Sequence, residues 1–62
     1  MIRITALPSG QISTVHDGTA YQAQDLTTIL RTLAALGIDG PWELRRESGK
    51  LIRAGRSVRE GL

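Results

Sequence analysis

The sequence predicts a small α+β domain in which one helix packs on one face of an antiparallel sheet, in the order βββαββ. Two observations predict it. Residues 25–37 carry leucine and isoleucine at helical spacing, whereas short apolar or alternating runs separated by turn residues lie on both sides. The 62 residues are enough for one domain. We expect it to span residues 1–54, followed by a basic, flexible tail at residues 55–62.

The first three predicted strands form two consecutive hairpins. Residues 2–7 alternate between apolar and polar side chains, and residues 8–10 are turn formers. Residues 11–15 and 19–23 flank Asp17-Gly18, a strong signal for a type I′ turn.

The two loop lengths fix a common register. They set Ile12 opposite Ala6 and Ala23, and Thr14 opposite Ile4 and Tyr21. The register predicts one apolar face, with His16 at its edge: Ile2, Ile4, Ala6, Ile12, Tyr21 and Ala23.

The helix has a capping residue at each end. Asp25 is a good N-cap, and Gly37 lies where a left-handed C-cap residue is expected. Its spacing predicts a buried stripe of five residues: Leu26, Ile29, Leu30, Leu33 and Leu36.

A second hairpin follows the connector at residues 38–41. We favour a three-residue loop, Glu47-Ser48-Gly49, because a two-residue loop would place Leu44 opposite Arg53 and Ile52 opposite Arg45. This choice sets Leu44 opposite Ile52, Trp42 opposite Ala54 and Glu43 opposite Arg53, with Trp42 on the core face.

The residues provide no constellation for catalysis, metal binding or a cofactor. The chain has no cysteine and a single histidine, His16, whose neighbour Asp17 is poorly placed to orient the ring. The six acidic residues lack metal-ligand spacing. No apolar run is long enough to span a bilayer. We therefore expect a non-enzymatic cytoplasmic protein that uses no cofactor, binds no metal and does not bind a membrane.

The positive charge lies in the C-terminal third of the chain. Such a stripe is compatible with three interpretations: contact with nucleic-acid phosphates, binding of an acidic protein, or a solvated face. The candidate partner-binding residues are Arg45, Arg46, Lys50, Arg53, Arg56 and Arg59.

A second candidate surface is the sheet face away from the helix. The predicted registers place aliphatic side chains there, next to Arg3 and Arg45. An uncovered face of this kind is typical of an association surface, so we expect a homodimer or a larger partner. The apolar residues of this face are Leu7, Val15, Ala20 and Leu51.

The hairpin and capped helix, ISTVHDGTAYQAQDLTTILRTL, resemble the hairpin-helix element of small phage head-tail joining proteins. The layout over residues 12–54 is similar to that of some phage-encoded anti-CRISPR proteins. This resemblance implies a small binder without catalytic residues. Our leading hypothesis is a non-catalytic inhibitor, adaptor or assembly factor that occupies a surface of a larger protein or ribonucleoprotein. The alternative is direct binding of DNA or RNA through the C-terminal cations.

Overall fold

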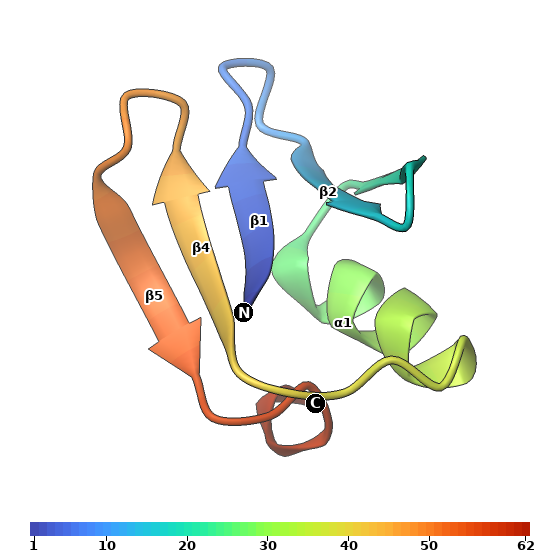
Figure 1. Ribbon diagram of the computed structural model, residues 1–62. Helices are drawn as coiled ribbons and strands as arrows, with labels where there is room; N and C mark the ends of the chain where they lie inside the picture. The colour runs from blue at the N-terminus through green and yellow to red at the C-terminus, as the bar shows by residue number, and fades with distance from the viewer.

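The computed structural model describes all 62 residues and confirms the α+β class and the order βββαββ (Figure 1). One helix lies against one face of a five-stranded sheet. The elements are β1 (Ile2–Ala6), β2 (Ile12–His16), β3 (Thr19–Ala23), α1 (Leu26–Ala35), β4 (Trp42–Arg46), β5 (Leu51–Gly55) and a short 3-10 helix, η1 (Arg59–Gly61).

The sheet is mixed, whereas we predicted an antiparallel one. The strand order is β3-β2-β1-β4-β5, and β1 pairs with β4 in parallel while the other neighbours are antiparallel. The chain leaves one edge of the sheet at β3, passes through α1 and returns on the other side of β1. A crossover of this kind joins parallel strands without a tight turn, so no local register predicts it.

The first two hairpins have the predicted register. Ile12 lies opposite Ala6 and Ala23, and Thr14 lies opposite Ile4 and Tyr21. The Asp17-Gly18 turn is left-handed at both positions, with φ angles of 49° and 78°, as a type I′ turn requires.

Both predicted helix caps are confirmed. The side chain of Asp25 accepts a hydrogen bond of 2.8 Å from the backbone N–H of Thr28. At the other end Gly37 has a φ of 77°, and the N–H of Ile38 donates to the carbonyl oxygen of Leu33, which closes a Schellman motif. Leu36 was wrongly assigned to the buried stripe, because at the C-cap the chain already leaves the helix and half of this residue is exposed.

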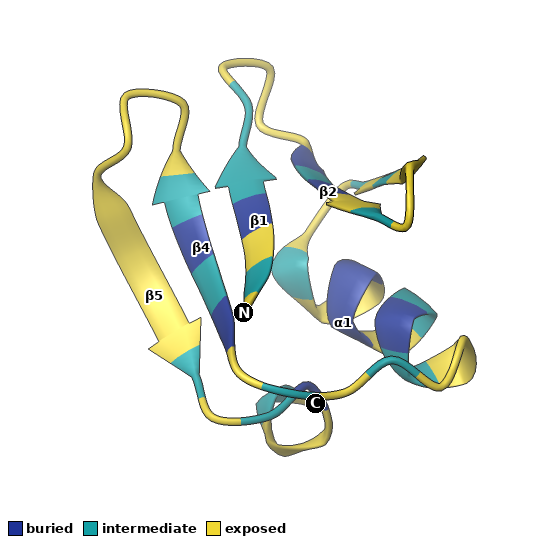
Figure 2. Cartoon of the chain, viewed as in Figure 1, coloured by how far each residue is buried: buried dark blue, intermediate teal, exposed yellow.

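The core lies between α1 and the adjacent sheet face (Figure 2). Four residues that we predicted on this face are partly buried and pack against the margin of the core: Ile2, Ala6, Tyr21 and Ala23. The buried cluster consists of Ile4, Ile12, Ile29, Leu30, Leu33, Trp42, Leu44 and Val58.

The predicted register of the second hairpin is correct next to the loop but wrong farther along the strands. Arg45 lies opposite Leu51 as predicted, but a register shift follows, so Leu44 faces Arg53 and Trp42 faces Gly55. The reason is the Trp42 indole: a Cβ atom at position 55 would lie 2.4 Å from its Cε2. The shift places Gly55, which has no side chain, against the Trp42 indole. It also leaves Ile52 out of the core, with 45% of its surface exposed.

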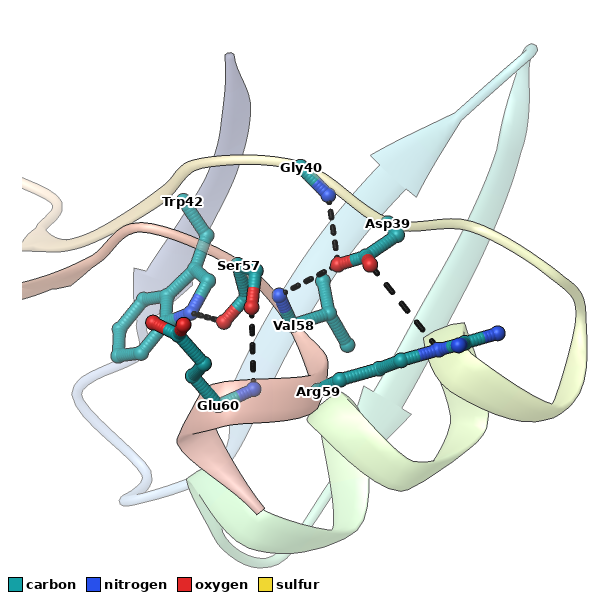
Figure 3. Close-up of polar contacts among 7 residues, drawn as sticks. All are labelled: Asp39, Gly40, Trp42, Ser57, Val58, Arg59 and Glu60. Carbon is teal, nitrogen blue, oxygen red and sulfur yellow. Dashed lines mark hydrogen bonds and ion pairs between the residues drawn. The ribbon is translucent and has the colours of Figure 1, made fainter.

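The C-terminal segment packs onto the domain, whereas we predicted a flexible tail. Val58 is completely buried in the core cluster. The indole nitrogen of Trp42 donates to the carbonyl oxygen of Ser57 at 3.0 Å, and the Ser57 hydroxyl accepts from the N–H of Glu60 (Figure 3). The segment from Ser57 to η1 therefore lies beside α1 and covers the end of β4 that the helix leaves open.

Candidate binding surface

The structure separates the six cations predicted to bind a partner. Arg45 lies on the sheet face away from α1, while the pairing of Arg53 with Leu44 puts Arg53 on the helix side. Strand alternation puts Arg46 on the helix side as well. Lys50 lies at the β4–β5 loop, and Arg56 and Arg59 follow β5.

Arg45 is held within its own hairpin. Its Nη2 lies 3.0 Å from Oε2 of Glu43, and its Nη1 donates to the carbonyl oxygen of Gly49 at 2.7 Å. The predicted partner of Glu43 was Arg53, and the register shift excludes that pairing by setting Ala54 opposite Glu43. Arg45 therefore closes the β4–β5 loop, and its charge is neutralised inside the hairpin.

Arg59 is the other predicted cation beside a carboxylate. Its Nε lies 4.0 Å from Oδ2 of Asp39, and 78% of its side chain is exposed (Figure 3). An exposed pair at this distance contributes little to stability.

The remaining four predicted cations are exposed and have no acidic oxygen within 4.0 Å. These four are Arg46, Lys50, Arg53 and Arg56. Arg46 is the last residue of β4, and the other three lie in the β4–β5 loop, on β5 or directly after it.

The same strand exposes two aliphatic side chains. Leu51 and Ile52 keep 47% and 45% of their surface accessible, and every residue of β5 except Gly55 is exposed (Figure 2). β5 is the last strand of the sheet, and among the strands α1 packs mainly against β2 and β3, at the other edge. We name this region the β5 edge surface: Arg46, Lys50, Leu51, Ile52, Arg53 and Arg56. Ile52 was not predicted to belong to this surface, because its apolar side chain fitted the core in the predicted register.

The predicted association face on the other side of the sheet is divided. Val15 and Ala20 form a cross-strand pair on β2 and β3, while Leu51 lies at the opposite edge. Leu7 is half-buried beyond the end of β1. Polar side chains occupy the middle of this face: Ser13, Thr5, Arg3, Glu43 and Arg45.

One open hollow of about 320 Å³ lies over β1, β4 and the β4–β5 loop. Its lining carries charges of both signs and a single apolar residue, Ile4. Glu43 and Arg45, which line it, already pair with each other. The hollow therefore offers an incoming ligand little apolar surface, and its unpaired charges are of both signs.

The histidine and acidic side chains form no group that could hold a metal ion. His16 Nε2 lies 3.5 Å from Oδ2 of Asp17, closer than predicted, but the Asp17 side chain is 92% exposed at the turn. No three of the histidine and acidic side chains come together. Hydrogen bonds from Thr28 lower the pKa of Asp25, and backbone hydrogen bonds from Gly40 and Val58 lower the pKa of Asp39. Both carboxylates therefore have a structural role as acceptors of backbone hydrogen bonds.

Comparison with protein-family models, with curated proteins and with solved structures finds no match to this chain. No helix has the length and apolar character needed to cross a membrane.

Proposed function

We propose that this chain is a non-catalytic binding protein that occupies a surface of a larger cytoplasmic protein or ribonucleoprotein through the β5 edge surface. The observation that carries the proposal is the combination of half-exposed Leu51 and Ile52 with four unpaired cations on one free edge. An inhibitor, an adaptor or an assembly factor would act in this way. The resemblance to small phage-encoded binders, anti-CRISPR proteins among them, supports the same class.

The energetics favour this surface over the rest of the molecule. Burying the exposed aliphatic area contributes roughly 25 cal/mol per Å². The four cations have no internal ion pair to lose when a partner's acidic group approaches, whereas Arg45 would have to leave Glu43. Apolar anchors beside free charges provide both affinity and orientation.

Affinity capture tests the proposal directly. The immobilised wild-type chain is compared with R46E/R53E in an extract of the organism that encodes it, and R31E is the control. The control reverses an exposed cation on α1, away from the β5 edge surface. We expect a shared partner on the wild-type and control proteins and its loss from R46E/R53E. A partner retained equally by R46E/R53E, or no retained partner, would contradict the proposal.

The four unpaired cations also favour a second candidate function, direct binding of DNA or RNA. Trp42 is buried and Tyr21 is half-buried, so no fully exposed aromatic ring is available to stack on a base. Fluorescence anisotropy with labelled random-sequence DNA and RNA tests this function. Binding that weakens steeply as salt is raised would move nucleic acid ahead of a protein partner.

A further inference from the structure

We propose that β5 captures a short, extended, acidic segment of a partner protein as a sixth strand of the sheet. This inference rests on the proposed function and specifies its partner and its binding mode. β5 is hydrogen-bonded to β4 on one side only, so its other side presents unpaired backbone groups. An added strand would satisfy those groups, as in other cases of strand addition to a sheet edge.

The side chains of β5 specify the chemistry of the added strand. Leu51 and Ala54 pair with Arg45 and Glu43 and therefore lie on the face away from α1, while Arg53 lies on the helix side. An added strand with aliphatic residues on one face and carboxylates on the other would match Leu51 and Ala54 on the first face and Arg53 on the second. Arg46 lies on the same side as Arg53, and Lys50 and Arg56 flank the two ends of β5, so these cations extend the positive field around the strand.

The charged residues favour β5 over β3, the strand at the opposite edge of the sheet, as the site of strand addition. β3 also has a free side, but its sequence, TAYQA, carries no charged residue. A second copy of this chain is disfavoured at β5, because two such strands side by side would bring cations together across the pair. An acidic segment avoids that repulsion.

The geometry of β5 limits the length of its partner. The strand has five residues, and the register shift lies between the Leu44 and Arg45 pairings. A bulge increases local twist and restricts extended pairing at an edge. We therefore expect an added strand of about four to six residues.

Labelled peptides test the binding mode. The probe is a six-residue peptide of alternating glutamate and valine. One control contains the same residues in two blocks, and a second carries N-methyl groups at alternating positions. Binding is followed by anisotropy and by amide chemical shifts. We expect the alternating peptide to bind and both controls to bind at least about tenfold more weakly, because one lacks the two-faced pattern and the other the hydrogen bonds.

Two measurements on the protein locate the added strand. R53E should weaken binding by about tenfold, while R31E, the same change on α1, should not. Amide exchange should slow in β5 and not in β3 when the alternating peptide is present. Equal binding of all three peptides, or perturbation of β3 in place of β5, would overturn the inference.

The outcomes separate this inference from the proposed function. Capture that depends on Arg46 and Arg53, combined with no binding of the alternating peptide, would overturn strand addition while the binding function stands. If no partner is captured in a way that depends on Arg46 and Arg53, both the proposed function and strand addition would be overturned. A concentration-dependent dimer that is lost in R53E would show that a second copy occupies the edge, and would also overturn the acidic segment.

Discussion

The backbone N–H of Val58 donates a hydrogen bond of 2.8 Å to Oδ1 of Asp39, which lies 19 residues earlier in the chain (Figure 3). The same oxygen accepts from the N–H of Gly40, also at 2.8 Å. One carboxylate therefore joins the connector before β4 to the C-terminal segment. The contact fixes the entry of Val58 into the core and closes the uncovered end of β4.

The Asp39 carboxylate makes the stability of the domain depend on pH. Hydrogen bonds from Gly40 and Val58 lower its pKa in the folded protein below the usual 3.8. Between the lowered pKa and the usual one, the unfolded chain binds more protons than the folded chain. The stabilisation that the Asp39 carboxylate contributes is therefore complete above the usual pKa, and it is lost as the pH falls through the lowered pKa. We expect the free energy of unfolding in urea to decrease between pH 5 and pH 3.

Two variants test this origin of the pH dependence. Asp39→Asn keeps the shape of the side chain and removes its charge, so it should lower stability at pH 7 and reduce the decrease at acidic pH. Asp17→Asn removes the same charge from the exposed turn, where asparagine tolerates the left-handed backbone, and should stay near wild type at pH 7. An Asp39→Asn protein with the full wild-type pH dependence would exclude the proposed role of Asp39.

Val58 should contribute to stability as a core residue. Val58→Ala removes two methyl groups from a completely buried site, and we expect a loss of about 2 kcal/mol in the free energy of unfolding. Val15→Ala is the matched control, since Val15 is 64% exposed on β2. Equal effects of the two substitutions would mean that residues 55–62 do not pack in solution.

Gly55 should resist substitution because of its contact with Trp42. In Gly55→Ala the new methyl group would meet the indole, and overpacking of this kind costs about 1–3 kcal/mol. Pairing the substitution with Trp42→Leu should recover part of that loss, since the smaller side chain gives the methyl group space. Strictly additive losses in a double-mutant cycle, measured by urea unfolding, would show that the ring does not cause the strain.

Local sequence signals were sufficient for the first hairpins and the helix. Asp17-Gly18 permits few backbone geometries, and that turn fixes the register of β2 and β3 without help from the rest of the fold. The helix ends are similarly local, because Asp25 and Gly37 act on backbone groups within a few residues.

Three of the wrong predictions depended on contacts between distant residues: the antiparallel sheet, the register of β5 and the flexible tail. The shift in β5 follows from the size of Trp42 relative to Gly55, which alternation cannot reveal because Ile52 fits an apolar position equally well. The burial of Val58 requires Asp39 from another part of the chain.

The candidate surface was predicted in part. Four of the six suspected cations are free, but Arg45 is not, and a local signal for this was present: residues two apart on a strand share a face, as Glu43 and Arg45 do. The exposure of Ile52 follows from the register shift and was not predictable from local pattern.

The internal pairing of Arg45 predicts that it supports the hairpin and does not contact the partner. Arg45→Gln should remove the ion pair with Glu43 and weaken the contact to Gly49, at a cost below about 1 kcal/mol because the pair is partly exposed. Amide exchange should become faster at the β4–β5 loop. Capture of the partner should be almost unchanged, whereas Arg53→Gln should leave the loop as stable as in the wild type and reduce capture. The reverse result, with capture lost in Arg45→Gln and kept in Arg53→Gln, would place the binding surface on the face of the sheet away from α1.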